Sequence, residues 1–253
     1  MTRHYVDAFV GEGAGGNRAC VIELDGWLPD GEMLQLAKDA ALPETAFFVR
    51  NGERFALRWF TPDIEMDLCG HATMAAAYAI SSIFRYVPDD VIFDTASGEV
   101  RVRVSRDGLL TLDFPSRMPE PAVLPEEIFE ALSFKPLEVS KARDYVLLYD
   151  SQEKIEQMQI DRPLFDRVCL DPGGVIVTAP GKECDFVSRF FTPQATILED
   201  PVTGSAHCSL TPYWSRRLGK KRMTARQLSE SGGVLFCEDA GERVFISGRA
   251  EKA

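Results

Sequence analysis

The stretch RWFTP at residues 58–62 decides the fold, because RFFTP repeats it at residues 189–193. The two copies begin 131 residues apart, which is about half of the 253-residue chain. Each copy is followed at a similar distance by a glycine that opens a run of small residues, GHAT at residues 70–73 and GSAH at residues 204–207. The repetition predicts two lobes built from one duplicated unit.

A third correspondence lies further along each copy, where a Ser-Gly turn leads into a pair of strand-like segments at Ser97 and again at Ser231. The segments alternate in period two, as RVRV does at residues 101–104, and short Asp-Gly or Ala-Gly turns join them at Gly108 and Gly241. Such turns join antiparallel strands. The fold class predicted is therefore α+β, with mostly antiparallel sheets.

Two segments have helical character of different kinds. Residues 72–84 carry no charge on any face, whereas residues 30–41 carry one apolar stripe. A helix that is apolar all round needs cover on every side, so we expect each lobe to wrap a sheet around one central apolar helix. We place the lobes at residues 1–117 and 118–253, with a proline-rich linker at 114–125 and the active site in the cleft between them.

Composition narrows the possible partners. The 28 Lys and Arg against 39 Asp and Glu leave a net charge of −11, so the basic face that nucleic acid requires is not expected. The longest apolar run, residues 74–80, is too short to span a bilayer, and the first twenty residues hold no apolar stretch of signal-peptide length. Six cysteines without a C-x-x-C pair suit reduced thiols. A cytoplasmic protein without nucleic-acid or membrane partners is expected.

The two repeated glycine turns are the first candidate binding site. Helix starts expose unpaired N–H donors and the positive end of the helix dipole. If the turns at Gly70 and at Thr203, Gly204 and Ser205 converge across a pseudo-twofold cleft, they form a site for a small carboxylate. Thr203 and Ser205 are also ordinary helix caps, and the duplication is what favours the binding role.

Glu44 is the second candidate, because it stands between an amphipathic helix and the apolar strand TAFF at residues 45–48. Burial disfavours the charged form of a carboxyl group and can raise its pKa toward neutrality, which suits a proton shuttle. An exposed turn residue is the plainer alternative.

Asp200 and His71 are further candidates beside the glycine turns. Asp200 precedes the second turn and could orient a substrate group or share a proton with His71, although Asp before Pro is also common in turns. His71 lies at a helix start, which lowers the pKa of its imidazole and favours the neutral form. A neutral ring can donate a hydrogen bond to a substrate oxygen or accept one.

No cofactor or metal is expected. The spacings around Cys69 and His207 lack the paired pattern of zinc sites. The glycine-rich residues 11–16 superficially suggest a dinucleotide fingerprint, but a strand-like segment follows instead of a helix, which indicates a hairpin turn.

Taken together, these motifs resemble the phenazine-biosynthesis PhzF isomerase family. The resemblance runs in order over nearly the whole chain and is carried by these segments: VDAF at 6–9 with Gly16-Asn17, ETAF at 44–47, CGHAT at 69–73 and EDPVTGSA at 199–206. It implies a diaminopimelate-epimerase-like fold, commonly a homodimer. It also implies that Glu44 moves a proton between substrate carbons without a cofactor, assisted by His71, Asp200 and Ser205.

Three departures from the family pattern stand out. Arg18 replaces a frequent Pro and Pro43 replaces a common Ser, and we expect both to border the cleft. The sequence after ISG at residues 246–248 is short of the apolar strand common in the family, so that edge strand is either missing or its role is filled elsewhere.

Two other functions compete with the isomerase. A two-base amino-acid racemase or epimerase of this fold would use a cysteine from each lobe, and Cys69 is available, but the partner position is Pro201. An interaction protein that has kept the fold without the activity is the other alternative. The presence of all four residues Glu44, His71, Asp200 and Ser205 weighs against it.

Overall fold

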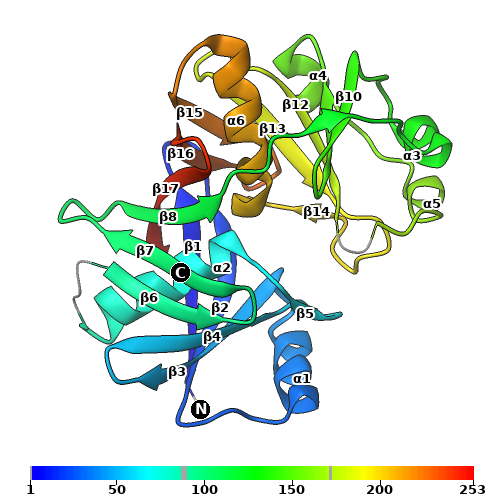
Figure 1. Cartoon of the computed structure of the whole chain (residues 1–253). Coiled ribbons are helices and arrows are strands. Elements are labelled where there is room, and N and C mark those ends of the chain that lie inside the picture. Colours follow the sequence, from blue (N-terminus) through cyan, green and yellow to red (C-terminus); the bar gives the residue numbers. More distant parts are fainter. Residues whose placement is uncertain (1, 87–89, 171–172) are drawn as a thin grey trace.

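Two groups of strands, one from each half of the chain, each enclose a helix in the computed structural model (Figure 1). The structure describes residues 2–86, 90–170 and 173–253. The first half forms β1 (Arg3–Val10), β2 (Asn17–Leu24), α1 (Asp30–Ala40), β3 (Glu44–Asn51), β4 (Arg54–Phe60), β5 (Glu65–Met66), α2 (Gly70–Tyr78) with its π-helical extension η1 (Ala79–Ile83), β6 (Asp90–Thr95), β7 (Gly98–Val104) and β8 (Leu110–Pro115). The second half forms β9 (Glu120–Pro121), α3 (Glu126–Ala131), β10 (Glu138–Lys141), β11 (Tyr145–Leu148), α4 (Gln152–Glu156), α5 (Arg162–Phe165), β12 (Val175–Pro180), β13 (Phe186–Phe191), β14 (Glu199–Asp200), the short 3-10 helix η2 (Gly204–Ala206), α6 (His207–Leu218), β15 (Arg222–Gln227), β16 (Gly233–Asp239) and β17 (Arg243–Lys252).

The strand pairings repeat from one half to the other. β2 and β3 pair in parallel, as do β11 and β12. β4 lies antiparallel to both β3 and β5 and parallel to β6, and β13 has the same relations to β12, β14 and β15. β6, β7 and β8 then form a meander, which β15, β16 and β17 repeat. The predicted duplication is therefore present in the topology.

Antiparallel pairing dominates, as the sequence predicts. Among the described residues, 13 of the 17 strand pairings are antiparallel, which confirms the α+β class. The glycine-rich residues 11–16 connect the antiparallel strands β1 and β2, so they form a hairpin turn. In the part of the chain that the structure describes, no helix has the length and hydropathy needed to cross a bilayer.

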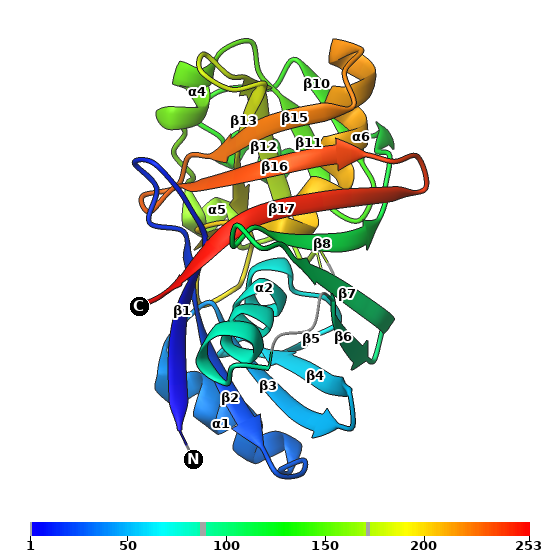
Figure 2. The ribbon, with the colours of Figure 1, turned by 90° about the vertical axis from the view of Figure 1, so that its left-hand side faces the viewer.

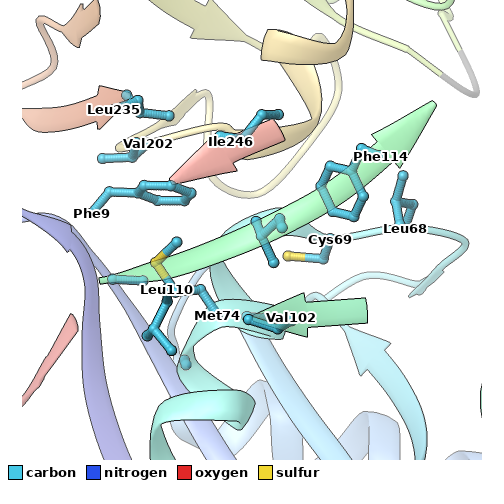
Figure 3. Close-up of a cluster of buried hydrophobic side chains, with 14 of the residues drawn as sticks. Phe9, Leu68, Cys69, Met74, Val102, Leu110, Phe114, Val202, Leu235 and Ile246 are labelled. Atoms are coloured by element: carbon cyan, nitrogen blue, oxygen red, sulfur yellow. The ribbon is translucent and has the colours of Figure 1, made fainter. Parts of the chain in front are cut away.

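The two central helices, α2 and α6, differ in how completely they are buried. In α2 every residue from Gly70 to Ala77 is buried, as its lack of charge predicts. In α6 burial extends to Ser215, but the last turn carries Arg216 and Arg217 and is exposed. Apolar side chains from both halves, including Phe9, Met74, Val202 and Ile246, pack together between the lobes (Figure 3). The interior of the molecule therefore holds the two lobes against each other.

The last strand connects the two groups. β17 pairs with β16 of its own half and also with β8 and β1 of the first half (Figure 2). Its end pairs Ala250 with Ala8 and Lys252 with Val6, so residues 249–252 continue the strand after ISG. The strand that the family pattern places after ISG is therefore present, formed by residues 249–252. The division into lobes between residues 117 and 118 stays a prediction. β17 belongs to the second lobe in sequence but also pairs with strands of the first.

Candidate active site

The two glycine turns meet across a cleft. A Cβ atom placed on Gly70 would lie 2.8 Å from the Cα of Gly204, and one on Gly204 would lie 3.1 Å from the Cα of Gly70. Only residues without a side chain allow two backbones to approach this closely. Both glycines line a cleft of about 560 Å³ together with His71, Thr203 and Ser205. The structure thus brings the predicted binding residues to one place, while their roles stay predictions.

Glu44 lies in the same cleft, at the first position of β3. The strand runs inward from this residue, since Thr45 to Phe48 are all buried, and Glu44 itself is 9% exposed. Burial raises the pKa of the Glu44 carboxyl group well above its ordinary value. The nearby charge of Asp200 adds to this increase, and a hydrogen bond from the Cys69 thiol opposes it. Such surroundings favour the protonated form of the carboxyl group.

His71 is the neighbour of Glu44. Its Nε2 lies 3.2 Å from Oε2 of Glu44, although the two atoms are not aligned as a hydrogen bond. Its Nδ1 lies 3.5 Å from Sγ of Cys69. Burial lowers the pKa of the His71 imidazole to about 3, so the ring is neutral at physiological pH. The lowered pKa agrees with the prediction made from the helix start, but its cause is burial of the ring.

Asp200 is held by two hydrogen bonds from opposite lobes. Nδ2 of Asn17 donates to Oδ1 at 2.6 Å, and Oγ1 of Thr203 donates to Oδ2 at 2.6 Å. Burial raises the pKa of Asp200 to about 7, although these two bonds favour the ionised form. Within the described chain, Asp200 has no hydrogen bond to His71. The carboxyl group that lies against the imidazole is that of Glu44.

The raised pKa values predict how stability depends on pH. A carboxyl group whose pKa is higher in the folded state stabilises the fold at low pH, and this contribution is lost as pH rises through the folded pKa. For Asp200 the window runs from its ordinary value of 3.8 to about 7. Glu44→Gln removes one of the two groups. We therefore expect its melting temperature, relative to the unmodified protein, to increase between pH 4 and pH 8.

The increase should amount to a few degrees, since 1 kcal/mol is worth about 2–4 °C in a chain of this size. Thermal melts followed by circular dichroism at several pH values measure it. A difference in melting temperature that does not change with pH would mean that Glu44 is ionised in the folded protein.

Gln227 belongs to the site, although no sequence motif pointed to it. Its Oε1 accepts a hydrogen bond from the backbone N–H of Thr203 at 2.8 Å. Its Nε2 donates to the carbonyl oxygen of Asp200 at 2.7 Å and to Oγ1 of Thr203 at 3.2 Å. Gln227 comes from β15, which pairs in parallel with β13, so only the folded sheet places it under the second glycine turn. It fixes the loop that carries Asp200.

One cluster has the composition of a metal site. The carboxylate of Glu44, the thiol of Cys69 and a ring nitrogen of His71 lie within 4.8 Å of one another, and all three residues are buried. These three groups could hold a metal ion if the thiol of Cys69 were deprotonated. Burial and the charge of Glu44 raise the pKa of the Cys69 thiol well above its usual value, which favours the protonated thiol. That no metal takes part stays a prediction.

Two expectations about the border of the cleft have different outcomes. Pro43 lines the cleft beside Glu44, as expected. Arg18 does not: its guanidinium is half exposed and forms two hydrogen bonds with Asp7, at 2.8 and 2.9 Å. The prediction for Arg18 was wrong because successive residues of β2 face opposite sides of the sheet, and Asn17 is the one that faces inward.

The thiols relevant to a racemase are placed as follows. Cys69 lines the cleft, and Pro201 is not among the lining residues that the structure describes. Cys169, which no motif singled out, is exposed and also lines the cleft.

The two lobes, the cleft between helix starts and the buried carboxyl groups define a class of enzyme with an epimerase-like fold. A hydroxyproline epimerase from Agrobacterium vitis, solved with bound trans-4-hydroxy-L-proline, has the same fold at 12% identity, with a TM-score of 0.65 over 99% of this chain and 90% of that one. At this identity the likeness concerns the fold alone.

More similar proteins identify the family. Residues 6–250 match the family described as phenazine biosynthesis-like protein, PhzC-PhzF, and the chain belongs to it. An uncharacterized isomerase of Pseudomonas aeruginosa is 46% identical over 98% of this chain and 94% of its own length. The crystal structure of a PhzF family protein from Enterococcus faecalis is 40% identical, with a TM-score of 0.91 over 100% of this chain and 97% of that one. Bacterial relatives at 38–46% identity are named isomerases, which places this chain in that class of enzyme.

Proposed function

We propose that the protein is a cofactor-independent isomerase that moves a proton between carbon atoms of a small carboxylate substrate, with Glu44 as general acid and base. The observation that carries the proposal is the position of the Glu44 carboxyl group. It is buried, lies 3.2 Å from a neutral imidazole, and lines the same cleft as two convergent helix starts. The names of the relatives support the isomerase class, and the substrate follows from none of them.

The chemistry proceeds in two proton transfers. The substrate carboxylate binds at the backbone N–H groups around Gly70 and Gly204, where the positive end of the α2 dipole favours negative charge. Ionised Glu44 takes a proton from one substrate carbon, and the electron pair of the broken C–H bond moves into the neighbouring double bond. The protonated Glu44 then returns a proton to the carbon at the far end of that system. Substrate and product therefore have the same composition.

His71 and Asp200 assist without changing the balance of atoms. The neutral ring of His71 can accept a hydrogen bond from protonated Glu44 at Nε2 once substrate binding aligns the two groups. Asp200, whose pKa lies near 7, adds negative charge that keeps Glu44 basic. The two carboxyl groups share one environment, so their ionisations are linked.

The test incubates the protein with small carboxylic acids that carry a double bond or a ring carbon next to the C–H bond that would break. We expect a product of unchanged mass in H2O, and at least partial deuterium incorporation at the receiving carbon in D2O, measured by mass spectrometry and proton NMR. Treatment with EDTA followed by dialysis should leave the turnover rate unchanged. A product of different composition, or activity that returns only when a metal or flavin is added, would contradict the proposal.

The predicted homodimer and the cytoplasmic location also remain proposals. Both come from the resemblance and the composition described above. The non-enzymatic alternative is disfavoured by the proximity of Glu44, His71 and Asp200 in one cleft.

A further inference from the structure

Arg143 is the only cationic residue among the described residues that line the cleft. The other charged lining residues are all carboxylates: Glu44, Asp63, Glu65, Asp67, Asp144 and Asp200. Most of the carboxylates outside the Glu44 site already have partners. Glu65 pairs with Arg58 at 2.6 Å, and Asp63 accepts two hydrogen bonds from Thr196. Arg143 therefore places a cation on one wall of an acidic cleft, beside the buried carboxyl group of Asp144, whose pKa burial raises and Arg143 lowers.

The duplication shows what kind of position Arg143 occupies. In one half of the cleft, Asn17 follows the β1–β2 turn and reaches across to Asp200, in the loop before Gly204. In the other half, Arg143 lies in the β10–β11 turn and reaches across to Asp67, in the loop before Gly70. The two contacts are similar in place but not equivalent, because the strand registers make Arg143 the counterpart of Arg18, one residue after Asn17.

The two contacts differ in strength. The Asn17 contact is 2.6 Å long, and Asn17 is fully buried. The Arg143 contact is 3.3 Å long, and the side chain of Asp67 is 54% exposed. A guanidinium group has five N–H donors, and in the described chain only this one bond occupies any of them. The side chain of Arg143 is nevertheless only 14% exposed, so its position is held while its hydrogen-bonding capacity is mostly unused.

The half of the cleft that contains Arg143 has no equivalent of the catalytic carboxyl group. Thr45 pairs with Phe60 and Val175 pairs with Phe191, the matching positions of the repeated phrase. Glu44 therefore corresponds to Gly174. A Cβ atom on Gly174 would lie 2.4 Å from the ring of Phe190, so that ring excludes any side chain there. One half of the cleft carries the acid–base group, and the other carries a cation beside an aromatic wall.

We propose that Arg143 binds a second carboxylate of the substrate, at the end remote from the reacting carbons, so that the substrate class is a dicarboxylate. This rests on the proposed function, in which the helix starts hold the first carboxylate. Met66, Phe190 and Ile197 line the cleft as apolar residues and suit a carbon skeleton between the two acidic ends. Arginine matches a carboxylate with two parallel N–H donors, which a single bond to Asp67 does not use.

The test compares matched pairs of acids by isothermal titration calorimetry: hexanoate with adipate, octanoate with suberate, and decanoate with sebacate. We expect at least one diacid to bind the unmodified protein tenfold or more tightly than the monoacid of equal length. Arg143→Met should abolish this preference and leave the affinity for monoacids unchanged. Arg143→Lys, which keeps the charge but loses the paired donors, should retain part of it.

Arg18→Met is the matched control, because Arg18 also forms an ion pair with an aspartate but lies outside the cleft. It should keep the full preference. Asp67→Asn, which removes the competing carboxylate, should strengthen diacid binding. Absence of a preference at every length, a preference that survives Arg143→Met, or equal weakening of monoacids and diacids would each overturn the proposal. Because binding needs no turnover, repeating the titrations with Glu44→Gln separates this result from the test of the isomerase.

Discussion

Glu44→Gln should lower the isomerisation rate by about 10²–10⁴-fold, which is the usual contribution of general acid–base transfer. Glutamine keeps the shape and polarity of the side chain but has no titratable proton. Deuterium incorporation at the reacting carbon should fall to the same extent. Cys69→Ser, made beside it in the same cluster, replaces the thiol by a hydroxyl group and should cost far less. Both rates are measured with the same substrate, by product formation and by mass spectrometry of the exchanged deuterium.

The comparison separates carboxylate chemistry from thiol chemistry. If Cys69→Ser abolished exchange while Glu44→Gln retained it, the base would be a thiol and the racemase alternative would replace the isomerase. Burial favours the protonated form of the Cys69 thiol, which is a poor base. We therefore expect exchange to be lost in Glu44→Gln and kept in Cys69→Ser. Both variants must keep the fold for the rates to be compared, so near-native circular dichroism spectra at the assay pH are part of the experiment.

Gly70→Ala should destabilise the protein and inactivate it at the same time. The added Cβ atom would meet three backbone atoms of the opposite lobe: Cα and C of Gly204 at 2.8 and 3.2 Å, and N of Ser205 at 3.3 Å. Backbone cannot rotate away as a side chain does, so the two turns must separate. Overpacking of this kind costs about 1–3 kcal/mol, and at 2–4 °C per kcal/mol it lowers the melting temperature by several degrees.

The loss of activity should be larger than the loss of stability suggests. A displacement of about 1 Å in a catalytic site can cost 10²-fold in rate, and both helix starts would move. Gly31→Ala is the matched control, since Gly31 lies in α1 with no atom within 4 Å of the added Cβ. That variant should be neutral or slightly stabilising. Equal behaviour of the two variants would mean that the close approach of the turns does not matter.

The repeated phrase predicted more of the fold than any helix or strand pattern did. It marks β4 and β13, which have the same neighbours in the two halves. The charge-free segment at residues 72–84 likewise predicted the buried helix α2 and its extension η1, because a helix without charged residues on any face needs cover on every side. These features are local, or repeat at a fixed spacing, and so they are visible in one sequence.

The parts that could not be predicted depend on contacts between distant strands. Gln227 supports the loop of Asp200 only because β15 lies beside β13. Arg143 reaches the cleft because the turn before β11 faces the loop before α2. Arg18 was misplaced because the sequence does not say which face of β2 points inward. Asp200 was the carboxyl group predicted to share a proton with His71, but Glu44 is the one that lies beside the ring.

The position of β17 has a consequence for how the protein folds during its synthesis on the ribosome. The sheet of the first lobe is completed by β17, which pairs with both β1 and β8 and is synthesised after the other strands that the structure describes. At about 5–20 residues per second, the first lobe waits on the order of ten seconds after its own residues have emerged. During that interval β1 and β8 present unpaired backbone edges, which invite pairing with other chains. A chaperone that covers these two edges would protect the nascent first lobe until β17 emerges.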